Sequence, residues 1–225
     1  MSTVEAAAGK AQAMVRDSVK TVIAASMVGT AIEFYDFYAY GTAAANYFPK
    51  VFFGDTTNPT VALLASLLTF AIAFIARPLG SLVFGHFGDR MGRKTTLVVS
   101  LMTMGVGTFL IGCLPSYAAI GIFAPALLLL LRMVQGFSAS GEYAGAATFL
   151  GEYAPTKKRG IYCSLIPAST AIGLLVGSTL ATVMTASLSS DALTSWGWRI
   201  PFLMAGPLGL IVHFIRTKLA DSPVY

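Results

Sequence analysis

Charged residues are scarce in this sequence. Asp, Glu, Lys and Arg make up 11% of its 225 residues, whereas hydrophobic residues make up 56%. An ordinary soluble domain carries about 25% charged residues, so this composition excludes that class. The net charge is +5, but the cations lie in the gaps between apolar runs, which argues against a nucleic-acid partner.

Cysteine and histidine are also few. Cys113 and Cys163 fall near opposite ends of their apolar segments, so we expect no disulfide between them, and neither lies in a metal-ligand pattern. His86 and His213 are far apart in the sequence. The chain has no Gly-x-x-x-x-Gly-Lys-Ser/Thr loop for binding a nucleotide. We therefore expect neither an enzyme nor a protein that uses a metal or cofactor.

Long apolar segments dominate what remains. Each exceeds the roughly 20 residues that a helix needs to cross a bilayer. They cover residues 20–45, 60–86, 94–114, 119–150, 160–187 and 197–219. We predict an all-α membrane protein whose six transmembrane helices form one bundle, 20–219, between an N-terminal tail at 1–19 and a short C-terminal end at 220–225.

The distribution of Lys and Arg predicts the orientation. If six segments cross the membrane, eleven of these residues lie on the same side as the two termini. Only Lys50 and Arg199 lie on the other side. Cytoplasmic loops carry an excess of Lys and Arg, so both termini are predicted to be cytoplasmic.

Two pairs of glycines four residues apart indicate how the helices pack. Gly141 and Gly145 form one pair, and Gly173 and Gly177 form the other. Each pair places small residues on one helix face, where backbones can approach closely in lipid. We predict that both pairs pack helices.

Five ionisable residues lie inside the apolar segments, where a bare charge costs about 2.5–3.5 kcal/mol. They are Glu33, Asp36, Arg77, Arg132 and Glu142. We expect them to face a protein interior or aqueous cavity, to pair with one another or, for the acids, to bind a proton. A route for ions or polar solutes is the default hypothesis for such charges, and we expect the acids at 33 and 36 and the guanidinium at 132 to face a wet pocket.

Glu33 and Asp36 are three residues apart and share a helix face, which Tyr40 extends by one turn. Two acids this close in a low-dielectric setting do not both ionise easily. We predict that Asp36 and Glu33 take up and release the proton of a proton-coupled carrier. The alternative is a hydrogen bond or ion pair that only holds the helices together.

Arg132, Gln135 and Glu142 share a face of the fourth segment. The guanidinium stays protonated at physiological pH and suits a substrate carboxylate or a carboxylate on the first segment. We predict that Arg132 pairs with Asp36 or Glu33 when the site is empty, and that protonation or an anionic group releases it. A permanent buried salt bridge is the alternative.

Further polar residues lie toward the cytoplasmic ends. Arg77 is expected to extend toward the interface or to pair with Glu142 or Glu152, in a structural or gating role. Ion pairs between Glu152 and the cations of the 85–94 loop would hold these ends together in one conformation and release them in another. The predicted gating residues are Asp89, Arg90, Arg93, Arg77, Glu142, Glu152 and Arg159.

Short motifs are spread from residue 20 to the DSP sequence at 221–223. They are GHFGDRMGRK at 85–94, EFYDF at 33–37, RPLG at 77–80, RMVQGF at 132–137, GEY at 141–143 and WGWRIPF at 196–202. Together they resemble the metabolite:proton symporter family of the major facilitator superfamily. Members of that family carry proline and betaine, shikimate, 2-oxoglutarate or citrate.

The resemblance implies a secondary transporter of the cytoplasmic (inner) membrane. Such a protein moves a small polar metabolite, for example a zwitterionic osmolyte or an organic acid, together with protons by alternating access. Glu33, Asp36 and Arg132 would line the path. The gating loop would contain Asp89, Arg90 and Arg93.

The residues leave the substrate open between zwitterions and organic acids. Arg132 permits a carboxylate, and Phe34, Tyr35 and Tyr40 could cage a quaternary ammonium by cation–π contact. The predicted substrate-binding residues are Arg132, Tyr35, Tyr40 and Gln135.

The resemblance covers only half of a transporter. Family members have twelve helices in two six-helix halves with the site between them, and this chain would end where the first half ends. Besides substrate, protons and lipid, the expected partner is the missing second half or a second copy of the chain. The alternative function is a non-transporting membrane fragment or scaffold subunit that needs a second half to work.

Overall fold

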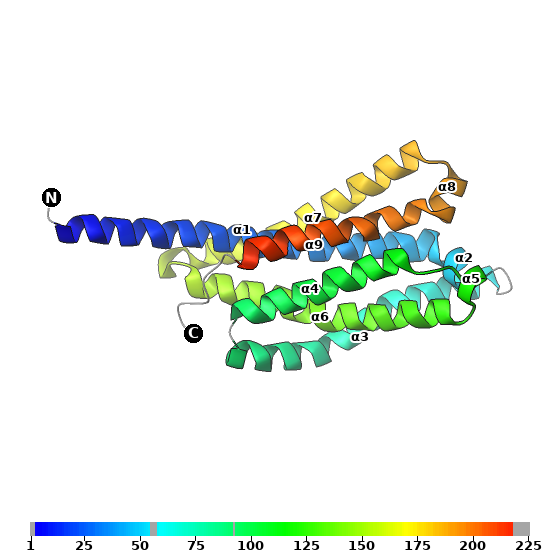
Figure 1. Cartoon of the computed structure of the whole chain (residues 1–225), viewed down its shortest axis with the longest axis horizontal. Coiled ribbons are helices and arrows are strands. Elements are labelled where there is room, and N and C mark those ends of the chain that lie inside the picture. Colours follow the sequence, from blue (N-terminus) through cyan, green and yellow to red (C-terminus); the bar gives the residue numbers. More distant parts are fainter. Residues whose placement is uncertain (1–2, 55–57, 92, 218–225) are drawn as a thin grey trace.

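The computed structural model describes residues 3–54, 58–91 and 93–217, and the fold is an all-helical bundle (Figure 1). The long helices are α1 (Thr3–Asn46), α3 (Pro59–Met91), α4 (Arg93–Cys113), α6 (Phe123–Tyr153), α7 (Arg159–Ser187) and α9 (Ile200–Thr217). Each overlaps one predicted apolar segment, so the all-α prediction is confirmed. Among the described residues, α3, α4, α6 and α7 are long and apolar enough to cross a membrane. That six helices span it, with cytoplasmic termini, stays a prediction.

Successive long helices run in opposite directions (Figure 1). The α3–α4 and α6–α7 junctions therefore lie at one end of the bundle, and the short helices α2, α5 and α8 lie at the other. The short elements are α2 (Phe48–Phe53), α5 (Tyr117–Ile120), η1 (Thr156–Lys158), α8 (Ser190–Ser195) and η2 (Gly197–Arg199).

Two helix starts differ from the sequence expectation. The first helix begins at Thr3, within the predicted tail, because its backbone continues without a break into the apolar segment. The fourth long helix begins at Phe123 rather than near residue 119, because Gly121 has a φ of 58° and ends the short helix α5. That left-handed conformation suits glycine and interrupts a helix.

Small residues set the helix spacing. A side chain at Gly173 would collide with the Ala31 carbonyl on α1, and one at Gly177 would lie 3.0 Å from the Tyr38 ring. Gly136 is packed as closely, because its Cα faces the backbone of Ala73 on α3. Glycine therefore brings α7 against α1 and α6 against α3.

The other predicted glycine pair also packs helices. A Cβ at Gly141 would lie 2.8 Å from Phe84 on α3, and one at Gly145 would lie 2.8 Å from Leu97 on α4. The prediction that both pairs serve helix packing is confirmed.

Aromatic side chains fill the end of the bundle near α2. Tyr40, Phe48, Phe52, Trp198 and Phe202 are almost completely buried there in one cluster. Their rings meet mostly edge to face, the arrangement that aromatic pairs favour. This packing closes that end beside the buried polar residues described next.

We predict that Gly136→Ala destabilises the bundle. The added methyl group meets the backbone of Ala73, which cannot move without separating α3 from α6, and such overpacking costs about 1–3 kcal/mol. Thermal unfolding in detergent should show a lower melting temperature than wild type. Gly85→Ala is the matched control, since a Cβ there meets nothing within 4 Å; equal melting temperatures for the two variants would contradict the prediction.

Candidate functional site

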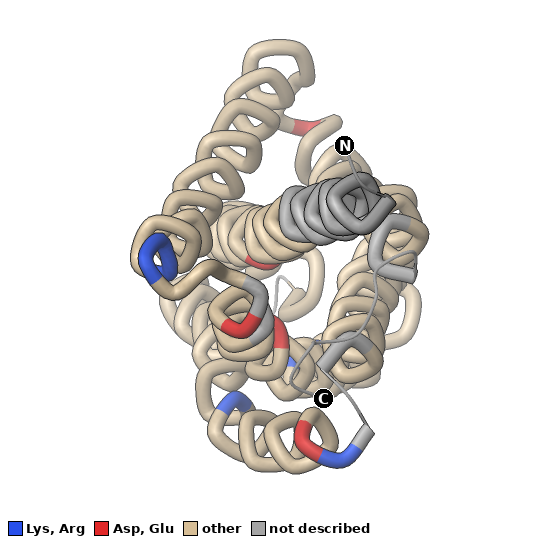
Figure 2. Tube along the Cα trace, turned by 90° about the vertical axis from the view of Figure 1, so that its left-hand side faces the viewer, with Lys and Arg blue, Asp and Glu red and all other residues tan. Residues whose placement is uncertain are grey.

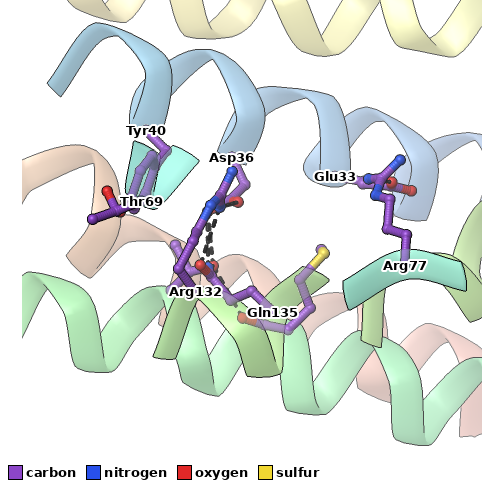
Figure 3. A network of polar contacts seen from close by, with 9 residues as sticks. Glu33, Asp36, Tyr40, Thr69, Arg77, Arg132 and Gln135 are labelled. Carbon is purple, nitrogen blue, oxygen red and sulfur yellow. Dashed lines mark hydrogen bonds and ion pairs between the residues drawn. The ribbon is translucent and has the colours of Figure 1, made fainter. Parts of the chain in front are cut away.

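Asp36 on α1 and Arg132 on α6 form an ion pair inside the bundle (Figure 3). Nη1 of Arg132 lies 3.1 Å from Oδ2 of Asp36, and the two side chains are 1% and 5% exposed. Of the two acids expected to pair with Arg132, Asp36 is therefore the partner. Two charges this deeply buried are tolerated because each neutralises the other.

Thr108 and Gln135 close a ring around this ion pair. Arg132 donates to Oε1 of Gln135 at 3.1 Å, and Nε2 of Gln135 donates to Oγ1 of Thr108 at 2.6 Å. Thr108 in turn donates to Oδ1 of Asp36 at 2.8 Å. Three helices, α1, α4 and α6, thus meet at one carboxylate, which accepts several hydrogen bonds.

Aromatic rings surround the guanidinium of Arg132. Its Cζ lies 3.9 Å from the ring centroid of Tyr40, and 5.4 Å and 5.3 Å from those of Phe37 and Phe70. The Tyr40 hydroxyl shares a 2.7 Å hydrogen bond with Thr69 on α3, which fixes the ring. Cation–π attraction therefore holds Arg132 in an aromatic pocket of the protein itself.

The aromatic cage predicted for a quaternary ammonium is not assembled. Tyr35 points toward α9, where its hydroxyl donates to the Pro201 carbonyl at 2.9 Å. Phe34 packs against Phe37 and Tyr143. Residues 35 and 40 project in different directions because they are five positions apart on a helix of 3.6 residues per turn.

A second ion pair joins Glu33 on α1 to Arg77 on α3 (Figure 3). Nη2 of Arg77 lies 2.6 Å from Oε1 of Glu33. Glu142 and Glu152 were the partners expected for Arg77, and Glu33 takes that place instead. Arg77 is 27% exposed and its Cζ lies 4.5 Å from the Phe37 ring, so this ring contacts both guanidinium groups.

The expected wet pocket is absent around the Asp36–Arg132 pair in the part of the chain that the structure describes. Asp36 and Arg132 are buried, and neither lines any of five cavities found among the described residues. The reason is mutual satisfaction, since each charge is paired and the aromatic rings pack around the guanidinium. The prediction of a wet pocket is wrong for this conformation, and the prediction of pairing holds.

Several buried polar atoms nevertheless lack a hydrogen-bond partner among the described residues. Four of them belong to the two ion pairs, namely Nε and Nη2 of Arg132, Nε of Arg77 and Oε2 of Glu33. An unsatisfied buried donor or acceptor costs about 1–3 kcal/mol. These atoms could bind an anionic group at Arg132 and a cationic group at Glu33.

Most of the predicted gating residues belong to the ends of α3 and α6 and the start of α7, which lie at the end of the bundle that faces the viewer in Figure 2. Asp89 and Arg90 are exposed in the last turn of α3, and Arg159 is exposed where α7 begins. Glu152 is half-buried near the end of α6, and Glu142 is fully buried further along that helix. The side chain of Arg93 lies outside the described residues. Their role in gating stays a prediction.

We predict that Arg132→Leu strongly destabilises the protein. The substitution leaves the Asp36 carboxylate buried without its counter-charge, and breaking a buried pair in this way costs about 3–5 kcal/mol. Chemical unfolding in detergent measures the loss. Lys157→Leu removes an exposed cation and serves as the control. A loss in Arg132→Leu no larger than in Lys157→Leu would show that the pair adds nothing to stability.

Comparison with known proteins supports one family. Residues 21–225 match the family described as "Sugar (and other) transporter". The inner membrane metabolite transport protein YhjE of Escherichia coli is 51% identical over 209 residues, which is 93% of this chain and 47% of that protein. The proline/betaine transporter of Salmonella typhimurium is 42% identical over 207 residues, 92% of this chain and 41% of that protein.

A solved structure has the same fold. The inward-open xylose transporter XylE from E. coli superposes with a TM-score of 0.77 at 15% identity, covering 92% of this chain and 49% of XylE. At that identity the likeness shows the fold alone. The chain spans about half the length of the curated relatives it matches.

Proposed function

Because the chain belongs to the sugar (and other) transporter family of the major facilitator superfamily, we propose that it forms half of a secondary active transporter. It is a multi-pass protein of the cytoplasmic (inner) membrane. The observation that carries the proposal is the buried Asp36–Arg132 pair, whose guanidinium keeps two nitrogen atoms without a partner among the described residues.

The substrate class that fits these atoms best is a zwitterion. A carboxylate can bind Nε and Nη2 of Arg132, since a guanidinium presents its donors in a planar fork. A positively charged nitrogen can lie against Oε2 of Glu33, which has no hydrogen bond among the described residues. The proline/betaine relatives support this choice.

Proton coupling follows from competition for Arg132. The guanidinium of Arg132 lies in a buried site, where it can neutralise only one negative group. A substrate carboxylate and ionised Asp36 therefore exclude each other. When Asp36 binds a proton, its charge disappears and Arg132 becomes free to bind substrate. The proton and the substrate therefore enter the site together. Glu33, paired with the partly exposed Arg77, is the second acid that can bind a proton.

Alternating access requires a second bundle. The bundle 20–219, between cytoplasmic ends at 1–19 and 220–225, would rock against a second half or a second copy of itself. Asp89, Arg90 and Arg93, with the other residues of that end, would form the gate. In the alternative function, the chain is a scaffold subunit that folds but transports nothing without its other half.

We predict that Asp36→Asn abolishes proton-driven uptake and leaves membrane insertion intact. Asparagine retains the size of the side chain but cannot ionise, so the competition for Arg132 disappears. Uptake of labelled proline, betaine, shikimate and dicarboxylates into proteoliposomes under a pH gradient measures the effect. Unchanged pH-dependent accumulation would remove Asp36 from proton coupling, and no wild-type uptake of any solute would favour the scaffold alternative.

Binding of the substrate should be visible without transport. Betaine or proline at a hundred times its dissociation constant should stabilise the purified protein by about 2.7 kcal/mol, raising its melting temperature, whereas Arg132→Lys should weaken the effect because lysine has no planar fork. A panel that also contains shikimate and dicarboxylates identifies the class. Stabilisation by dicarboxylates alone would contradict the zwitterion assignment.

A further inference from the structure

The hydroxyl group of Thr108 on α4 has one proton but two hydrogen-bond acceptors within reach. Its Oγ1 lies 2.8 Å from Oδ1 of Asp36 and 3.0 Å from the carbonyl oxygen of Met104. At the same time it accepts a hydrogen bond from Gln135. A hydroxyl offers one proton and two lone pairs. Thr108, which is 1% exposed, can therefore satisfy only one of its two acceptors at a time, and has one lone pair left.

We propose that Thr108 is a positioning residue that accommodates both protonation states of Asp36 by rotating its hydroxyl group. While Asp36 is ionised, Thr108 donates to Oδ1. When a proton from solution binds Oδ1, this new O–H donates to Oγ1 of Thr108, whose own proton turns to the Met104 carbonyl. The only net change is the proton that the carboxylate gains. The proposal rests on the proposed role of Asp36 in proton coupling.

The geometry keeps the free energy of this rotation low. Both acceptors already lie within hydrogen-bond distance of Oγ1, so no heavy atom has to move. Gln135 donates to Oγ1 at 2.6 Å and can do so in either state, which leaves the second lone pair for Asp36. When a proton neutralises Asp36, Arg132 loses its counter-charge, but every polar atom around Thr108 still has a hydrogen-bond partner.

The hydroxyl group of Thr108 does not stabilise the ionised and the protonated state of Asp36 equally. A hydrogen bond to an ionised carboxylate is roughly twice as strong as one between neutral groups. Thr108 therefore stabilises the ionised state of Asp36 more than the protonated state. Removing the hydroxyl should make Asp36 bind its proton at a higher pH.

Other ionisable groups act on the same acid, directly or through Glu33. They are Arg132 and Glu142 on α6, Arg77 on α3, and Glu33, Tyr35 and Tyr40 on α1. His213 on α9 is a further titratable group in this part of the bundle, since its neighbour Val212 packs in one buried cluster with Ile32 and Met104. Substituting the uncharged Thr108 leaves all these charges in place.

The test is an infrared titration of the protein in liposomes. The carboxyl band that Asp36→Asn removes identifies Asp36, and its intensity against pH gives the midpoint of protonation. Thr108→Val retains the shape without the hydroxyl and should raise the midpoint by about one pH unit, a tenfold change in proton affinity. Thr108→Ser retains the hydroxyl and should titrate like wild type.

The matched control is Thr103→Val. Thr103 lies on the same helix and its hydroxyl bonds only to the Val99 carbonyl among the described residues, so the midpoint should not move. A folded Thr108→Val protein with the wild-type midpoint overturns the proposal, and so does Thr108→Ser with the midpoint of Thr108→Val. If Thr108→Val does not fold, Thr108→Ala carries the same expectation.

The titration also separates this inference from the proposed function. It reads the protonation of Asp36 directly and requires no uptake. A shifted midpoint in a protein that accumulates no solute supports the role of Thr108 and contradicts the transport proposal alone. Proton-driven uptake whose pH dependence is the same in Thr108→Val and wild type supports transport and contradicts the role of Thr108.

Discussion

The ion pair between Asp36 and Arg132 is the interaction on which the rest of the bundle depends. Burial of both charges is tolerable only while each neutralises the other, so α1 and α6 must stay in register at this point. Thr108 and Gln135 add hydrogen bonds to the same carboxylate. The glycine contacts that draw the helices together provide the short distances that this network requires. Packing and electrostatics therefore enforce the same arrangement.

Aromatic rings connect this pair to the second one. Phe37 contacts the guanidinium groups of both Arg77 and Arg132. Of these two groups, Tyr40 contacts that of Arg132. The pair that includes Arg77 is partly exposed, whereas the other is sealed. A change of charge at Glu33 can thus influence Arg132 through one shared ring and the adjoining turn of α1. This arrangement gives the site two buried acids whose guanidinium partners differ in exposure.

Much of the fold was predictable because a membrane-spanning helix is a local property of length and apolarity. The sequence also limited the partner of Arg132 to two acids, because a buried charge has few possible partners. The Arg77–Glu33 pair and the role of Thr108 were not predictable, because they depend on how neighbouring helices rotate about their axes. A threonine in an apolar helix usually bonds to its own backbone, so nothing in the sequence distinguished Thr108. The wet pocket was wrongly expected because pairing and aromatic packing satisfied the charges first.

The central claim is that a substrate carboxylate takes the place of ionised Asp36 at the guanidinium of Arg132, while a proton binds Asp36. Proton uptake during ligand binding tests it most directly, recorded with a pH electrode in weakly buffered solution after betaine or proline is added to the purified protein. The account predicts that a proton is taken up with each ligand bound near neutral pH, and that Asp36→Asn removes this uptake while ligand still binds. Binding without any proton uptake, or uptake that persists in Asp36→Asn, would contradict it.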